Sequence, residues 1–159
     1  MENRRQSIIP NHYFSYVSSE CQSLFEHGYY YGCIALCQAV AEAFARFMYE
    51  KWTGNPPSET FGANIHKLRA ANVQPSVSEL LEAIYGGQQR NDFHHLNPTI
   101  PAKYEQLRSI AVEKIALLNK VESQVFEYKF GDGTILTRYP QYWETTEGCN
   151  NVFLRYDLP

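Results

Sequence analysis

The residues best suited to chemistry lie in one short segment, residues 90–95. Within six positions this segment holds one guanidinium, one amide, one carboxylate and two imidazoles. An imidazole titrates near neutral pH and can therefore move protons under physiological conditions. A guanidinium can bind a phosphate through two parallel hydrogen bonds. Together these groups could cleave a phosphodiester bond without a metal ion.

The spacing of these residues restricts how they can meet. On a regular α-helix Asn91 and His95 lie on one face. Arg90 shares a face with His94 but not with His95. Arg90 and His95 could act together only if the backbone leaves the regular helix, if the arginine reaches across it, or if a second subunit supplies one of the two groups. The glycine pair at 86–87 could provide such a departure.

Apolar residues recur at helical spacing over most of the chain, which predicts a mainly α-helical fold. We expect helices over residues 13–26, 30–52, 64–72, 75–96 and 101–124, with the fourth interrupted or kinked at the glycine pair 86–87. The period then changes to two, on either side of Gly131, Asp132 and Gly133, which predicts a β-hairpin. A short third strand could follow at 153–156. The expected organisation is a helical bundle over residues 1–125, with a β-hairpin extension over 126–159 packed on it.

The helix expected over residues 30–52 is apolar around much of its circumference. Two neighbouring stripes of apolar residues run along it, and such a helix is buried on more than one side. Because one small bundle would not easily cover so much apolar surface, we expect a homodimer. Glu42 lies within this apolar run. It is either a supporting partner for Arg90 or a buried acid that needs a cation, and both readings stay open.

The segment at 90–95 resembles the motif of the HEPN superfamily (higher eukaryotes and prokaryotes nucleotide-binding). That motif is an arginine, a polar residue that is often asparagine, a few further residues and then a histidine. Arg90, Asn91 and His95 match these three positions. The upstream tract at 28–50, with its internal acid Glu42, resembles the long second helix of the family. The resemblance extends over residues 13–124.

This resemblance implies both an activity and a mode of assembly. HEPN proteins are helical bundles that commonly dimerise and so bring two motifs together. Many are metal-independent endoribonucleases, often in toxin–antitoxin, defence or RNA-processing systems. The resemblance therefore implies RNA as the substrate, with catalysis by Arg90, Asn91 and His95.

Other residues take supporting roles in this scheme. Glu42 and His94 could support the catalytic groups, and Lys103 and Arg108 follow the motif closely enough to line an RNA-binding groove. An antitoxin or another partner protein could regulate the activity. In the form paired with nucleotidyltransferase antitoxins, a tyrosine lies two residues after the histidine. Asn97 stands there in this chain, which puts that scheme in doubt.

Two alternatives to an active ribonuclease remain. The polar residues at 90–95 could be the solvated end of a helix, or the chain could be a non-catalytic HEPN module that binds a partner protein, RNA or a nucleotide. Cys33 and Cys37 lie one helical turn apart and could hold a metal ion with His94 and His95. Core packing explains the cysteines better, because free thiols behave as small apolar groups. We expect no metal and no cofactor.

Composition limits the class of protein. The chain has 159 residues, 44% of them hydrophobic, and a net charge of −3. A protein that binds nucleic acid by broad phosphate neutralisation is usually basic, so RNA would have to be bound at a local site or between two subunits. The N-terminus is polar and no stretch is apolar enough to cross a membrane. We therefore expect a cytoplasmic protein with reduced cysteines.

Overall fold

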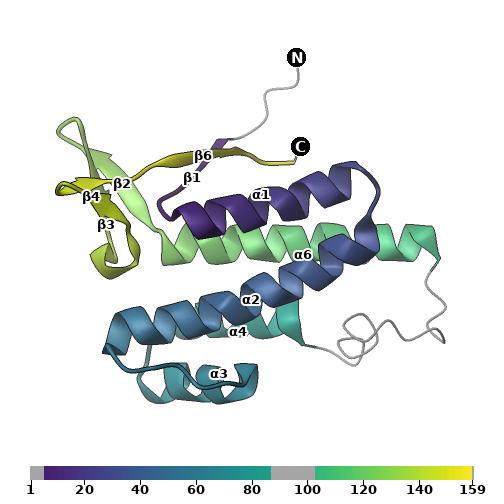
Figure 1. Ribbon diagram of the computed structural model, residues 1–159, viewed down its shortest axis with the longest axis horizontal. Helices are drawn as coiled ribbons and strands as arrows, with labels where there is room; N and C mark the ends of the chain where they lie inside the picture. The colour runs from purple at the N-terminus through teal and green to yellow at the C-terminus, as the bar shows by residue number, and fades with distance from the viewer. Residues whose placement is uncertain (1–5, 87–102, 159) are drawn as a thin grey trace.

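The computed structural model describes residues 6–86 and 103–158, which form a helical bundle with a small β region (Figure 1). The helices are α1 (His12–Glu26), α2 (Tyr30–Thr53), α3 (Phe61–Ala70), α4 (Pro75–Tyr85) and α6 (Tyr104–Val125), with a short 3-10 helix, η1 (Pro140–Tyr142). The strands are β1 (Gln6–Ile9), β2 (Tyr128–Gly131), β3 (Thr134–Thr137), β4 (Thr145–Thr146), β5 (Cys149–Asn150) and β6 (Phe153–Tyr156). The expected mainly α fold with a small β appendage is confirmed. Among the helices of the described segments, none combines the length and apolar character needed to span a membrane.

Local capping groups explain where several helices begin and end. The side chain of Asn11 accepts the backbone N–H of Phe14 at 3.1 Å and caps α1. Thr60 accepts the N–H of Ala63 at 3.3 Å in the same way. Because of this cap, α3 begins earlier than the apolar spacing predicts. Gly54 follows α2 with a φ of 71°, in the left-handed region where glycine is favoured.

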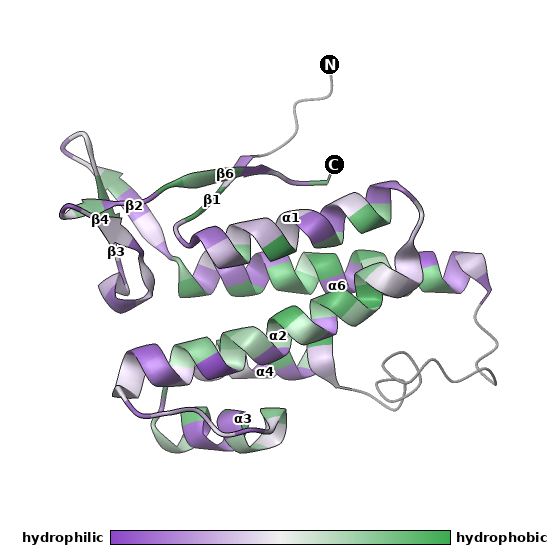
Figure 2. Cartoon of the chain, viewed as in Figure 1, coloured by the Kyte–Doolittle hydropathy of each residue, from purple (hydrophilic) through white to green (hydrophobic). Residues whose placement is uncertain are grey.

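Helix α2 is the centre of the bundle. The helices α1, α3, α4 and α6 all pack against it, and Figure 2 shows apolar residues along most of its length. Phe14 of α1 stacks on the buried Phe44 of α2, with ring centroids 3.9 Å apart. The chain therefore covers the apolar circumference of α2 by itself. The expected homodimer cannot be argued from this helix, and it remains a prediction based on the HEPN resemblance.

The described strands pair antiparallel in three two-stranded sheets, β1–β6, β2–β3 and β4–β5. The predicted hairpin is β2–β3, whose turn residues Asp132 and Gly133 have φ angles of 51° and 76°. The third predicted strand is β6, but it pairs with β1 near the start of the chain, and Ser7 lies opposite Arg155. The sequence did not predict β1. This ribbon joins the first described residues to the C-terminal extension.

Strand β6 buries its arginine and exposes two of its apolar residues. Arg155 and the following Asp157 are 3% and 5% exposed, whereas Leu154 and Tyr156 are 59% and 58% exposed. Side chains alternate between the two faces of a strand, so this register directs the charged set toward the bundle. Arg155 therefore points toward the helices.

The cysteines have different environments but are all free thiols. Cys21, Cys33 and Cys37 are buried in the core, whereas Cys149 is exposed. A hydrogen bond with Cys37, together with burial, raises the pKa of Cys33 far above the ordinary range of a thiol. A buried, protonated thiol packs as a small apolar group, which agrees with the packing role expected for Cys33 and Cys37.

Candidate functional site

The motif predicted to carry catalysis lies outside the described residues. The segment 87–102 contains all of its members, which are Arg90, Asn91, His94 and His95. The structure describes the two points that this segment connects. Helix α4 ends at Tyr85, and helix α6 begins at Tyr104. The surroundings of these two points are therefore the described part of the candidate site.

A lysine holds the end of α4 against the middle of α6. The Nζ atom of Lys114 donates to the carbonyl oxygen of Ala83 at 2.5 Å. This bond satisfies one of the last carbonyls of α4, which lack partners within their own helix. Burial lowers the pKa of Lys114. Because α6 begins ten residues earlier, at Tyr104, its first turns extend past the end of α4 (Figure 1).

Aromatic side chains gather where α6 begins. The ring of Tyr104 packs on Tyr30 of α2 with centroids 4.8 Å apart, and a side-chain hydrogen bond with Tyr30 raises the pKa of Tyr104. Gly28 has a φ of +78°, and a Cβ at this position would lie 2.7 Å from the Tyr104 hydroxyl oxygen. Backbone conformation and space therefore both favour glycine here. Next to it, the rings of Tyr29 and His27 are nearly parallel at 8°, with centroids 6.3 Å apart.

The two basic residues predicted to bind RNA, Lys103 and Arg108, also lie at the start of α6. Lys103 and Arg108 are both exposed, and the guanidinium carbon of Arg108 lies 5.6 Å from the ring centroid of Phe25. Two tyrosine rings beside them are 64% and 58% exposed, those of Tyr29 and Tyr104. We call this set the aromatic tip: Tyr29, Lys103, Tyr104 and Arg108.

Glu42 pairs with a cation of its own helix. Its Oε1 accepts a hydrogen bond from Arg46 Nη2 at 3.0 Å, and the same nitrogen donates to the carbonyl oxygen of Glu59 at 2.6 Å. Phe61, two residues after Glu59, stacks on Tyr85 with centroids 3.8 Å apart. The described cation partner of Glu42 is therefore Arg46. The Glu42 side chain is 29% exposed, so it is not the buried acid of the second reading. The chain of contacts also connects Glu42 to the last residue of α4, where the motif segment begins.

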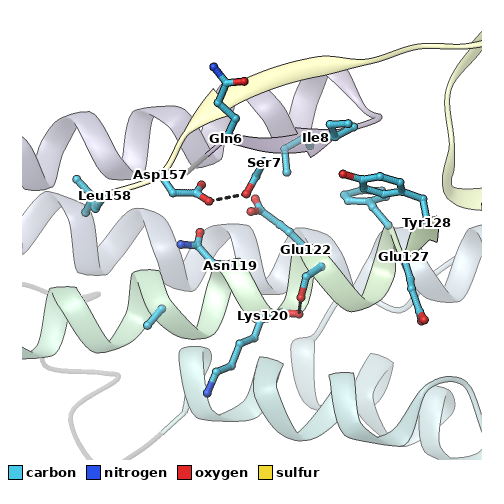
Figure 3. Close-up of a pocket in the computed structure, with 14 residues that line it drawn as sticks. Gln6, Ser7, Ile8, Asn119, Lys120, Glu122, Glu127, Tyr128, Asp157 and Leu158 are labelled. Atoms are coloured by element: carbon cyan, nitrogen blue, oxygen red, sulfur yellow. Dashed lines mark hydrogen bonds between the residues drawn. The ribbon is translucent and has the colours of Figure 1, made fainter. Parts of the chain in front are cut away.

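The structure contains a buried polar network that the sequence did not predict. At its centre is Arg155 of β6. Its Nη1 donates to Glu122 and, at 2.8 Å, to Ser18 Oγ. Its Nη2 donates to Asn119 Oδ1 at 2.9 Å and to Asp157 Oδ1 at 2.7 Å, and Nε donates to the same Asp157 oxygen at 2.9 Å. Figure 3 shows Asn119, Glu122 and Asp157 converging from α6 and from the end of the β ribbon.

Burial governs the electrostatics of this network. The side chains of Arg155, Glu122 and Asp157 are only 3%, 2% and 8% exposed. Desolvation raises the pKa of Glu122, and the positive charge of Arg155 partly offsets that rise. The ion pair is therefore almost completely buried, and it joins β6 to α6 and, through Ser18, to α1.

One sequence signal for this network existed. Glu122 continues the stripe of Ile115, Leu118 and Val125 at steps of three and four, so an acid occupies an apolar position of α6. A buried carboxylate needs a cation or a proton. The spacing does not indicate which cation, because Arg155 lies 33 residues further along the chain.

The described residues contain no candidate metal-binding cluster. In residues 6–86 and 103–158, no group of three or more histidine, cysteine, aspartate or glutamate side chains could hold a metal ion. The two histidines of the alternative site with Cys33 and Cys37, His94 and His95, lie outside those ranges.

Comparisons with family models, with curated proteins and with solved structures found no match for this chain. Its function must therefore be inferred from its own residues and their arrangement.

Proposed function

We propose that this protein is a metal-independent endoribonuclease of the HEPN type, acting through Arg90, Asn91 and His95. In this mechanism His95 removes the proton of the ribose 2′-hydroxyl or donates one to the leaving 5′-oxygen. Arg90 stabilises the charge that develops on the phosphorane-like transition state. Asn91 orients the phosphate or His95. The 2′-oxygen attacks phosphorus as the 5′-oxygen leaves, so the products carry 2′,3′-cyclic phosphate and 5′-hydroxyl ends.

The observation that carries this proposal is the motif in its helical context. An arginine, an asparagine and a histidine stand at the HEPN spacing in residues 90–95. The motif follows a long helix with an internal acid, α2 with Glu42, and lies between α4 and α6. The mainly helical fold is compatible with the helical bundles of the HEPN superfamily.

The aromatic tip supports single-stranded RNA as the substrate. Exposed rings can stack on unpaired bases, and Tyr29 and Tyr104 are both exposed close to the start of α6. Lys103 and Arg108 can neutralise phosphates locally, which a chain of net charge −3 cannot do over its whole surface.

The test is cleavage of RNA in the presence of a chelator. We expect the purified protein to cut unstructured RNA in excess EDTA and to leave cyclic phosphate ends. The same sequence made of DNA should stay intact, because it lacks the attacking 2′-hydroxyl. Loss of cleavage on chelation, or equal cleavage of the DNA, would contradict the mechanism.

A second candidate is a non-catalytic module that binds RNA at the aromatic tip. The observation that favours it is that stacking rings and cations need no catalytic group to hold a strand. Under this alternative the protein binds single-stranded RNA but leaves it intact across several substrates. Binding without cleavage by the parent protein would therefore select the module over the enzyme.

A further inference from the structure

One edge of strand β1 has no described partner. Strand β6 pairs with the other edge, and the described sheet consists of these two strands. In an antiparallel pair, alternate residues direct their backbone N–H and C=O groups toward the neighbouring strand, and the residues between them direct theirs away. Among the described residues, the backbone of Gln6–Ile9 makes no backbone hydrogen bond beyond its pairing with β6. The second edge of β1 therefore presents unpaired donors and acceptors.

A groove of about 560 Å³ lies along this edge, between β1 and α6. All four residues of β1 line it, although their side chains alternate between two faces of the strand. The groove therefore borders the backbone edge of β1 and not only one of its faces. Figure 3 shows β1 above the groove and α6 below it, with Leu158 at one end and Tyr128 at the other. The groove thus runs along the strand, in the direction that an extended peptide would take.

The helical wall of the groove leaves space for the side chains of an occupant. Ala116, Lys120 and Ser123 line it at steps of four and three, and all three are exposed. The side chains of Ala116 and Ser123 are small. The Ser123 hydroxyl donates to the carbonyl oxygen of Lys120 at 2.9 Å, within its own helix. An extended chain can therefore lie against this wall without displacing a bulky side chain.

Lys120 supplies the available charge of the groove. The three acids that line the groove each have an arginine partner: Glu122 and Asp157 bind Arg155, and Glu127 binds Arg138. Lys120 makes no ion pair with any described residue. Figure 3 shows its amine pointing away from the carboxylates of Glu122 and Asp157. The charge of Lys120 is therefore complementary to an acidic side chain of an occupant.

The outer face of the β ribbon favours apolar side chains. Ile8 lies opposite Leu154, and Leu154 is 59% exposed on this face. A strand added to the free edge of β1 would place one of its side chains beside Ile8 and so extend the apolar row across three strands. Because side chains alternate along a strand, the residues on either side of that position would point toward α6.

We propose that β1 binds an extended segment of a partner protein as an additional strand, in the groove beside α6. Main-chain hydrogen bonds to the free edge supply affinity, and the alternating side chains supply selectivity. The segment carries apolar side chains on the outer face, beside Ile8. On the face toward α6 it carries small polar side chains and one acidic side chain that pairs with Lys120.

A synthetic strand tests the proposal. The probe is a fluorescein-labelled peptide of seven residues in which valine alternates with threonine, with one threonine replaced by glutamate. We expect saturable binding, measured by fluorescence anisotropy, with a dissociation constant below about 1 mM. N-methylation of alternate residues blocks the donors of only one edge of the peptide. One of the two methylated forms should therefore bind roughly tenfold more weakly, and the other should bind like the parent peptide. Equal losses in both forms, or no binding of the parent peptide, would overturn the proposal.

A charge exchange tests the role of Lys120. Lys120→Glu should weaken binding of the glutamate peptide about two- to fivefold, the range of an exposed ion pair. The same variant should bind a peptide with lysine in place of that glutamate more tightly than the parent protein does. If neither protein distinguishes the two peptides, the proposed acidic preference is wrong.

Two tryptophan variants assign the binding to this groove. Ser123→Trp should abolish peptide binding, because it fills the groove from an exposed position of α6 and leaves the core unchanged. Glu113→Trp is the matched control, since Glu113 is exposed on α6 but does not line the groove. Unchanged binding in Ser123→Trp, or an equal loss in both variants, would refute the assignment. Light scattering tests a second copy as the occupant: a dimer that Ser123→Trp converts to a monomer would give the edge to β1 of another copy and overturn the proposal of a different partner.

Discussion

Arg155 and Glu122 form an ion pair inside the protein, between strand β6 and helix α6. Their side chains are 3% and 2% exposed, and 33 residues separate them in the chain. A buried ion pair contributes little net stability compared with apolar packing, but removing one partner leaves the other as an uncompensated buried charge. This pair therefore makes the attachment of the β ribbon to the bundle sensitive to single substitutions.

The first prediction concerns the stability of that attachment. Arg155→Met should lower the free energy of unfolding at neutral pH by about 3–5 kcal/mol, because it leaves buried carboxylates without their cation. The control is Arg138→Met, which removes an exposed ion pair with Glu127 and should cost less than about 1 kcal/mol. Urea denaturation followed by circular dichroism measures both. Equal losses in the two variants would mean that the Arg155 network adds nothing beyond a surface pair.

The second prediction concerns pH. The pKa of Glu122 is raised in the folded protein above its ordinary value of 4.5, chiefly by burial. Between these two pKa values the folded state holds a proton that the unfolded state has released, so stability must fall as pH rises through this window. Glu122→Gln cannot release that proton. Denaturation of both proteins from acidic to neutral pH should therefore show the parent losing stability relative to Glu122→Gln, and parallel curves would contradict the shift.

The third prediction concerns catalysis. His95→Ala should slow RNA cleavage by roughly a hundred- to ten-thousandfold, the usual contribution of general acid–base catalysis. Arg90→Ala should lose about a hundredfold or more, because a charge that stabilises the transition state is removed. His94→Ala is the matched control, an adjacent histidine of the same chemistry, and should matter much less. A gel-based cleavage assay measures all three, and a reversal between the two histidines would shift the motif by one residue.

The fourth prediction concerns RNA binding at the aromatic tip. Tyr29→Ala should weaken binding of single-stranded RNA roughly tenfold, since stacking on one ring contributes about 1–3 kcal/mol. Phe130→Ala is the control, because Phe130 is 70% exposed on β2, in the β region far from the start of α6 (Figure 1). Fluorescence anisotropy with a labelled oligonucleotide measures both affinities. If the two variants bind as tightly as the parent, the tip is not the RNA surface.

The fifth prediction concerns assembly. A composite HEPN site requires two motifs, so light scattering at micromolar concentration should report twice the chain mass of 18.4 kDa. This prediction no longer draws on α2, whose apolar surface is covered within the chain. A monomer that cleaves RNA would show that one motif is sufficient.

The helices were largely predictable from the sequence because their signals are local. The apolar spacing of α2 and the glycine that ends it lie within the helix and its next residue, and the observed bounds, Tyr30–Thr53, differ from the expected 30–52 by one residue. The β2–β3 hairpin was predictable for the same reason, since Asp132 and Gly133 form its turn. Local patterns therefore account for the bundle and the hairpin.

The remaining features depend on residues that are distant in sequence. Strand β1 has four residues and no clear alternation, and it is a strand because β6 pairs with it. In β6 the apolar pattern would predict the opposite orientation of the strand, because Leu154 is exposed and Arg155 is buried. The orientation is set by Glu122 and Asn119 on α6. No local pattern contains that information, so the network could not be predicted from the sequence.

The pairing of β1 with β6 has a consequence for biosynthesis. Ser7 and Asp157 are hydrogen bonded across 150 residues of chain, and contacts of such high sequence separation are slow to form. Translation releases the N-terminal end first, so β1 and Glu122 must wait for Arg155 to leave the ribosome. A nascent chain that stops before β6 keeps a carboxylate in its helical core without its guanidinium and leaves β1 without a partner strand. A chain without β6 therefore lacks both the partner strand of β1 and the guanidinium that binds the buried carboxylate of Glu122.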